Sequence, residues 1–320
     1  PEVGLIKLTP RLKSGSYLGG SDTVGTQSGN VGRFYAHHLD TTVNTQGCSS
    51  FTYDRQPIPK TTITAKANGG ATLTNYRGSS TASISFAKPV TLTDTTGQGS
   101  LSPVVGALAF SAGTAVLDGA DADHPRVTFQ FTTNPSLPAT IAIAAADSDA
   151  SGVAGSAGSA NIRSGRVRLG NAYGSELLAL PLPMELQYWN AAWVPNAADT
   201  CSVITPGQFA WAFPGGSVSR PNNLAACESA VSVAGTAPSY LVALSAPGAT
   251  NAGWADLTLN LAATAVGTQC TSVGAAGPAA TTANLPWLQF NWLGAGAANP
   301  RGHATFGTFR SPLIYRRENY

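Results

Sequence analysis

Charged side chains are too scarce in this chain to cover the solvent-exposed faces of long helices. Only 11% of its 320 residues are Asp, Glu, Lys or Arg, whereas about a quarter is usual in soluble domains. A surface helix needs such residues along one side, and a disordered chain needs them to remain expanded. Since 43% of the residues are hydrophobic, we expect the chain to fold, and to do so without long surface helices.

Short runs in which apolar and polar residues alternate recur along the sequence. Clear cases are TTITAKA at 61–67, RVTFQFTT at 126–133 and GRVRL at 165–169. A period of two turns one face of a strand toward a core and the other toward water. The 35 Gly and 21 Pro residues supply turns between such strands. The pattern predicts an all-β fold with two apposed immunoglobulin-like β-sandwich domains and long loops.

The low-complexity run SGVAGSAGSAN at 151–161 is interpreted as the loop between the two domains. We expect a leading strand and a Gly/Ser-rich connector at 1–30, a first sandwich at 31–160 and a second at 161–320.

The second sandwich is predicted to begin with the strands GRVRL and MELQYW. On these strands Arg166 and Glu185 are expected to face each other. The prolines between the strands, Pro181 and Pro183, are expected in a bend or at a sheet edge, where a missing N–H is tolerated.

Charge and hydropathy argue against two classes of partner. The formal net charge is only +2, and no basic run is longer than Arg316–Arg317, so nucleic acid has little electrostatic footing. No apolar run reaches the roughly 20 residues of a membrane span. The chain starts at Pro1 and is interpreted as a piece of a longer precursor, so a missing signal peptide carries no information.

Four widely spaced cysteines, Cys48, Cys201, Cys227 and Cys270, include no C-x-x-C pair. An even number without close ligand pairs favours two disulfides in an oxidising compartment over a zinc site. Three connectivities are open.

Carboxylates at Asp118, Asp121 and Asp123 form a weak calcium candidate, because a hard cation prefers several oxygen ligands. Their spacing misses the EF-hand pattern, and Asp is a common turn residue, so solvated turns are favoured. His37 and His38 are expected to point to opposite faces of a strand and hence to be poor co-ligands. No other cofactor is expected.

No catalytic signature is present. The sequence contains no G-x-S-x-G, H-E-x-x-H or P-loop motif. Glu176 and Glu185 are close in sequence, but the prolines between them leave their geometry unreadable, and a glycosidase requires two carboxylates at a set separation. We expect a protein that is not an enzyme, with a hydrolase as the last-ranked alternative.

Aromatic residues offer a candidate contact for a sugar or a protein. Among the six tryptophans, Trp189, Trp193 and Trp287 are the candidate ligand contacts. Trp292 alternates in phase with Leu288 and Phe290 and is expected in the core, as sandwich tryptophans commonly are.

Several motifs together resemble one family. They are GLIKLTPRL, YLGG, NVGRFYAHHLD, CSSFTYDRQPI, RSGRVRLGNAYGSELLALPLPMELQYWN, PWLQFNW, RGHATFGTFR and the terminal IYRRENY. Their order is similar to that in the C-terminal region of the MSHA (mannose-sensitive haemagglutinin) biogenesis protein MshQ family, from near Val3 to Tyr320. That family belongs to type IV pilus gene clusters of Gram-negative bacteria.

The resemblance implies a secreted, envelope- or pilus-associated β-rich protein, often preceded by a lectin-like domain. It supplies no catalytic residues. Cys48 and Cys201 look like family positions and Cys227 and Cys270 like additions, which implies the pairs Cys48–Cys201 and Cys227–Cys270. Proximity in sequence would instead favour Cys201–Cys227. The run YAHHLD replaces a family Pro-Asp-His, which puts a role for His37 in doubt.

Together these observations predict a non-enzymatic structural and interaction module of a secreted bacterial protein, at the cell surface or associated with a type IV pilus. Its expected partners are pilus or other cell-surface proteins and an upstream domain of the same precursor. The alternative is a glycan- or surface-binding adhesin domain, with or without a dependence on calcium.

Overall fold

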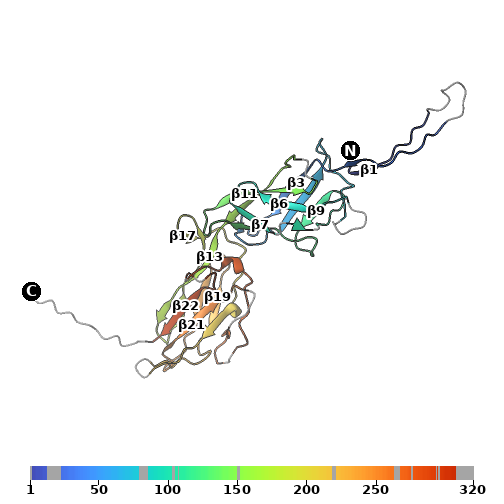
Figure 1. The fold of residues 1–320 in the computed structure, drawn as a ribbon. Helices are drawn as coiled ribbons and strands as arrows, with labels where there is room; N and C mark the ends of the chain where they lie inside the picture. The colour runs from blue at the N-terminus through green and yellow to red at the C-terminus, as the bar shows by residue number, and fades with distance from the viewer. Residues whose placement is uncertain are drawn as a thin grey trace, which may run out of the picture. The chain divides into compact units, whose positions relative to one another are not determined.

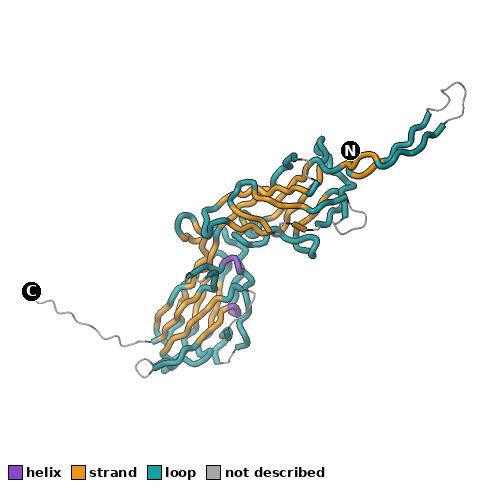
Figure 2. The backbone as a smooth tube through the Cα atoms, in the orientation of Figure 1, coloured by secondary structure: helices purple, strands orange, loops and turns teal. Residues whose placement is uncertain are grey.

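The computed structural model describes most of the chain and contains strands but no α-helix in the part described. The described residues are 2–12, 23–78, 86–102, 105–106, 108–149, 152–217, 221–262, 267–274, 277–292, 294 and 296–307. Two short 3-10 turns, η1 (Pro206–Gln208) and η2 (Pro286–Leu288), are the helical elements among them (Figure 2). The all-β prediction is confirmed. Most of the predicted Gly/Ser-rich connector and the terminal IYRRENY motif lie outside the described residues.

The chain divides into two compact units. Unit 1 comprises 1–134 and 139–162, and unit 2 comprises 135–138 and 163–320. The short segment 135–138 belongs to unit 2, where the backbone N–H of Ser136 donates to the Ser164 hydroxyl. No local sequence pattern indicates that placement.

The described part of unit 1 is built around an eight-stranded sheet. The sheet order is β4-β12-β11-β3-β5-β9, with β6 paired to β11 and β8 paired to β6; Figure 1 labels β3, β6, β9 and β11 of this sheet. The strands of unit 1 are β1 (Gly4–Ile6), β2 (Val31–Phe34), β3 (His38–Thr45), β4 (Thr52–Tyr53), β5 (Lys60–Lys66), β6 (Val90–Asp94), β7 (Gly99–Ser102), β8 (Val105–Gly106), β9 (Thr114–Leu117), β10 (Thr128–Phe131), β11 (Ala139–Asp147) and β12 (Gly158–Arg163). The pairs β1–β2 and β7–β10 are separate antiparallel ladders.

Alternation explains which face of each strand is buried. In β5, Thr61, Ile63 and Ala65 are buried, while the residues between them are half-buried. In β11, Ile141 and Ile143 are likewise fully buried. Burying one such isoleucine contributes about 1.5–3 kcal/mol, so the shared core of these strands holds unit 1 together.

Strand β12 corrects the expected interdomain loop. The last four residues of the run 151–161 belong to this strand, which pairs antiparallel with the first half of β11. Gly158 and Ala160 are buried and Ser159 and Asn161 are exposed. Buried and exposed residues do alternate in β12, but most of them are small and have low strand propensity, so the sequence does not reveal the strand.

The described residues of unit 2 form three sheets. Their orders are β13-β16-β17, β14-β22-β21-β18 and β15-β20-β19. The strands are β13 (Gly165–Leu169), β14 (Ala172–Gly174), β15 (Leu180–Leu182), β16 (Met184–Trp189), β17 (Trp193–Pro195), β18 (Phe209–Ala212), β19 (Val231–Ala234), β20 (Leu241–Leu244), β21 (Gly253–Leu259) and β22 (Arg301–Phe306). Pro181 lies in β15, an edge strand, as its missing N–H requires.

The register of β13 and β16 differs from the expected one by two residues. Arg168, and not Arg166, lies opposite Glu185, with 3.7 Å between Nη1 and Oε2. Arg166 lies opposite Gln187. Alternation alone does not reveal this register, because a shift of two residues leaves the same side chains on each face of the strand.

All four cysteines are disulfide-bonded, so the prediction of two disulfides is confirmed. Cys227 and Cys270 are joined to each other and fully buried. Backbone bonds from Val231 N–H to the Cys270 carbonyl and from Gly274 N–H to the Cys227 carbonyl flank the cross-link. The disulfide therefore fixes a loop to the start of β19. The pairing of Cys48 with Cys201 stays a prediction.

Candidate functional site

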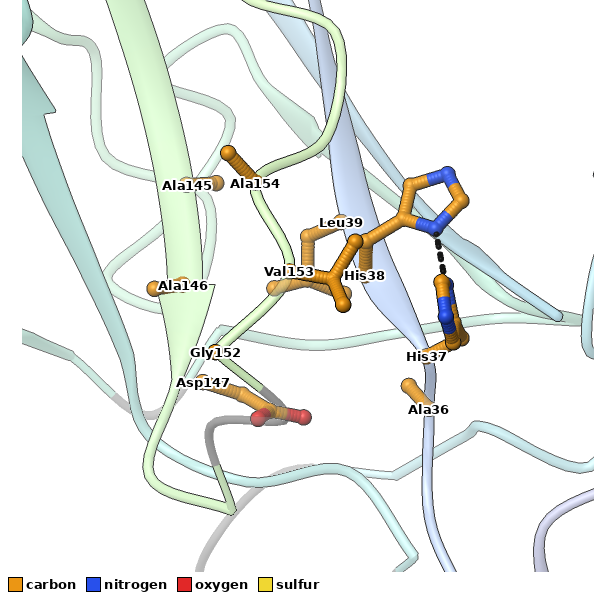
Figure 3. Close-up of a pocket in the computed structure, with 10 residues that line it drawn as sticks. All are labelled: Ala36, His37, His38, Leu39, Ala145, Ala146, Asp147, Gly152, Val153 and Ala154. Carbon is orange, nitrogen blue, oxygen red and sulfur yellow. Dashed lines mark hydrogen bonds between the residues drawn. The ribbon is translucent and has the colours of Figure 1, made fainter. Parts of the chain in front are cut away.

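A cavity of about 220 Å³ lies in unit 1 beside the start of β3. Its lining includes His37, His38 and Asp147, and the remaining wall is apolar, with Leu39 from β3, Ala145 from β11 and Val153 from the segment before β12 (Figure 3). We call it the histidine cavity. The two imidazole rings lie together at its edge, and the Asp147 carboxylate enters from the end of β11.

The expectation that the two histidines point apart is wrong. Their Nδ1 atoms are 2.9 Å apart and hydrogen-bonded, and the ring planes meet at 79°. His37 lies in a bend directly before β3 and not in the strand, so strand alternation does not apply to it. On its other side, His38 places Nε2 3.5 Å from Oδ1 of Asp40.

Asp147 is held by fixed donors at the wall of the cavity. The buried Tyr76 hydroxyl donates to its Oδ2 over 2.9 Å, and the N–H of Asp149 donates to Oδ1 over 3.1 Å. The N–H of Lys88 in turn donates to the Tyr76 oxygen. Burial, with the nearby Asp147 charge second, raises the pKa of Tyr76 far above its ordinary value. Tyr76 therefore acts as a permanent donor to this carboxylate.

A second cluster lies in unit 2 around Arg166. The guanidinium carbon lies 4.2 Å from the ring centre of Trp193, 5.0 Å from that of Phe290 and 4.9 Å from that of Trp292. Trp189 extends this arginine–aromatic cluster, since its ring centre is 5.5 Å from that of Trp193. A cation over aromatic faces contributes about 0.5–2 kcal/mol per favourable contact, so Arg166 joins β13, β17 and the chain after η2.

A polar chain continues from Arg166 along the same sheet. Its Nε donates to Oε1 of Gln187, and Nε2 of Gln187 donates to Oε2 of Glu185. Burial lowers the pKa of Arg166 to about 10, the Arg168 charge adds to this, and the Glu185 charge opposes it. The Glu185 carboxylate thus belongs to a structural network, a role that its sequence position did not indicate.

Of the three predicted tryptophan contacts, two lie together. Trp189 and Trp193 are directly opposite each other across the tight turn between β16 and β17, and both are half-buried. Trp287 lies apart from strands, in η2, and its buried indole N–H has no hydrogen-bond partner in the described structure. The alternation of Leu288, Phe290 and Trp292 does not correspond to a strand, because the 3-10 turn Pro286–Leu288 takes its place. Binding of a ligand by these residues stays a prediction.

Trp292 is half-buried rather than a core residue. It lines a separate cavity of about 300 Å³ in unit 2, together with Leu169 and Arg301. Its position is set by the contact with Arg166, because residues after η2 do not continue as a strand.

The Asp118–Asp123 loop uses its carboxylates as turn acceptors. Asp118 Oδ1 accepts the N–H of Ala120, and Asp121 Oδ1 accepts the N–H of Asp123 and contacts Nδ1 of His124 at 2.7 Å. The carboxylates of Asp118, Asp121 and Asp123 do not bring three ligand atoms within 4.8 Å of one another. Calcium binding there stays a prediction.

Sequence reasoning missed one ionisable pair in unit 2. His303 of β22 lies opposite Asp256 of β21, with 2.7 Å between Nδ1 and Oδ1. Both residues line an open hollow of about 460 Å³ on the sheet face. Because 47 residues separate them in sequence, only the strand register brings them together.

Family comparisons cover both parts of the chain. The model of the third domain of DUF6701 matches residues 2–172, and that of the fourth domain matches residues 163–319. No curated protein matches the sequence. Among described residues, no helix has the length and hydropathy needed to cross a membrane.

Two solved structures of the surface layer protein SbsC are weakly similar. Domains 4–9 share 8% identity and a TM-score of 0.21, over 79% of this chain and 33% of that one. Domains 5–6 share 9% identity and a TM-score of 0.20, over 84% of this chain and 96% of that one. The chain thus spans about a third of the first SbsC structure. A likeness of this size establishes no common fold.

Replacing Tyr76 by Phe tests the support of Asp147. At neutral pH we expect Tyr76→Phe to lower the free energy of unfolding of unit 1 by about 1–3 kcal/mol, because a buried acceptor loses its donor. Above the ordinary tyrosine pKa of about 10, unfolded Tyr76 releases a proton that the native residue keeps, so stability falls with rising pH by about 1.4 kcal/mol per unit.

The Tyr76→Phe variant has no phenol proton to release at this position, so its free energy of unfolding should fall less steeply above pH 10. Urea unfolding followed by circular dichroism reports on both units, and the part of the transition that tryptophan fluorescence does not show belongs to unit 1. Tryptophan fluorescence serves as the control, since all six tryptophans lie in unit 2. Equal slopes for both proteins would contradict the assignment.

Arg166 and Arg168 form a matched pair on one strand. We expect Arg166→Ala to lower the free energy of unfolding of unit 2 by about 1–3 kcal/mol, because three ring contacts and a hydrogen bond are lost. Arg168→Ala removes only an exposed ion pair and should cost less than about 0.5 kcal/mol. Urea unfolding followed by tryptophan fluorescence measures both, and equal losses would refute the structural role of Arg166.

Proposed function

We propose, starting from the fact that this chain belongs to the DUF6701 family, that it is an extracellular structural and interaction module. It presents β-sheet surfaces to other proteins and performs no catalysis. The single observation that carries this proposal is that all four cysteines are disulfide-bonded. Stable disulfides form and persist in oxidising compartments, and are rare where thiols are kept reduced.

The construction of the two units supports a structural role. Both consist of short strands with a buried face, and the buried Cys227–Cys270 cross-link secures a loop of unit 2. The clusters around Arg166 and Asp147 are tied into hydrogen-bond networks with neighbouring side chains. Groups held in this way stabilise a fold, whereas an enzyme requires a nucleophile or a base directed at a substrate.

Edge strands supply the interaction surface in this proposal. β14 and β15 stand at the ends of their sheets. Tyr173 of β14 is 62% exposed, and Leu241, at the start of β20 beside β15, is 74% exposed. A strand of a partner protein can extend such a sheet through backbone hydrogen bonds, with exposed side chains adding specificity.

The finer proposal is that the module belongs to a type IV pilus system, as the resemblance to the MshQ family implies. Its partners are then pilus proteins and a preceding domain of the same precursor. The motifs that carry the resemblance, from GLIKLTPRL to RGHATFGTFR, run through both units. Some of these motifs are strands that the fold itself requires, so the association with a pilus has to be tested in cells.

Labelling of intact cells with a membrane-impermeant amine reagent tests the proposal. We expect the native protein to be labelled before lysis, with a cytoplasmic marker unlabelled, and to be recovered with pili sheared from the cells. Labelling only after lysis would overturn the surface location. Surface labelling without recovery in the pilus fraction would overturn only the pilus association.

A further inference from the structure

The two adjacent histidines of unit 1 bring their Nδ1 atoms within hydrogen-bonding distance of each other. We propose that His37 and His38 form a bidentate site for a divalent transition-metal ion that favours cis nitrogen ligands, Cu²⁺ first and Ni²⁺ second, at the edge of the histidine cavity. The observation behind this is the 2.9 Å approach of the two Nδ1 atoms, from rings that meet nearly at right angles.

The separation of the nitrogens selects the ion. Metal–imidazole bonds are about 2.0–2.1 Å long, so two nitrogens 2.9 Å apart subtend an angle of about 90° at the metal. That angle belongs to neighbouring positions in square-planar or tetragonal coordination, which suits Cu²⁺ and Ni²⁺. Tetrahedral coordination requires nitrogens about 3.3–3.4 Å apart at the same bond length, so Zn²⁺ fits less well.

Asp40 orients one of the two ligands. Its Oδ1 lies 3.5 Å from Nε2 of His38 and also accepts the N–H of Ser156 over 2.7 Å. A carboxylate on this side favours the tautomer with the proton on Nε2, which leaves the Nδ1 lone pair of His38 directed at His37. In the metal-free protein His37 then donates its Nδ1 proton to His38.

Metal binding replaces that shared proton. The proton on Nδ1 of His37 moves to Nε2 of the same ring through solvent, with no net loss of protons. Each ring then turns about its Cβ–Cγ bond, so that its Nδ1 lone pair leaves the line between the two nitrogens and points at the ion.

The histidine cavity provides room for the remaining ligands. Its volume of about 220 Å³ holds several water molecules. Among the described residues, no third His, Cys or carboxylate atom lies within 4.8 Å of both nitrogens. The open positions are therefore filled by water or by a small anion, and the bound ion remains exchangeable.

The other two histidines of the chain supply matched controls. His124 and His303 each place Nδ1 2.7 Å from the carboxylate of an aspartate, and neither lies beside a second imidazole. Replacing one of them removes a histidine from the protein but leaves the proposed site intact.

Copper binding to the untagged chain, measured by titration calorimetry and electron paramagnetic resonance, tests the proposal. We expect one Cu²⁺ per chain with two nitrogen ligands in the spectrum, and weaker binding of Zn²⁺. His37→Gln and His38→Gln should each weaken Cu²⁺ binding at least tenfold, whereas His124→Gln should leave it unchanged. Asp40→Asn keeps an oxygen for Ser156 and should weaken binding about tenfold.

Circular dichroism melting establishes that each variant is folded. Cu²⁺ binding that is equal in wild type and in the His37→Gln/His38→Gln double variant would overturn the proposal. So would a folded wild-type protein that binds no Cu²⁺, or a loss of binding that is as large in His124→Gln as in His37→Gln.

Discussion

Burial of one face of each short strand is the constraint on which both units depend. The chain has too few charged residues to cover the exposed faces of long helices. The polar faces of its strands consist largely of Thr, Ser, Asn and Gln. Strands such as β5 and β11 turn isoleucines inward and small polar or alanine side chains outward. Because each strand has only one apolar face, no strand is stable until another layer covers it.

Alternation made the strands predictable, but it left register and irregular backbone open. β10 and β13 could be recognised because their inward residues are large and apolar. β12 could not, because its inward residues are Gly158, Ala160 and Ile162 and the first two resemble loop composition. The pairing of Arg168 with Glu185 could not be predicted from alternation, because a shift of two residues keeps the same side chains on each face.

Sites were harder to predict than strands because they depend on strand register and on irregular backbone. The meeting of His37 with His38 depends on a bend that precedes β3, and the meeting of His303 with Asp256 depends on register. The arginine–aromatic cluster brings β13 and β17 into contact with the chain after η2, which is far from them in sequence. Residue types pointed to aromatic contacts and argued against a joint role for His37 and His38, and only the folded chain shows which side chains meet.

The central claim is that disulfides secure an extracellular β-protein. The most direct measurement is mass spectrometry of the protein isolated from its own cells, alkylated without reduction and then digested. The account predicts no alkylated cysteine and a peptide that joins Cys227 to Cys270; the pairing implied by family resemblance adds one that joins Cys48 to Cys201. Alkylated Cys227 or Cys270 in the folded native protein would contradict the account.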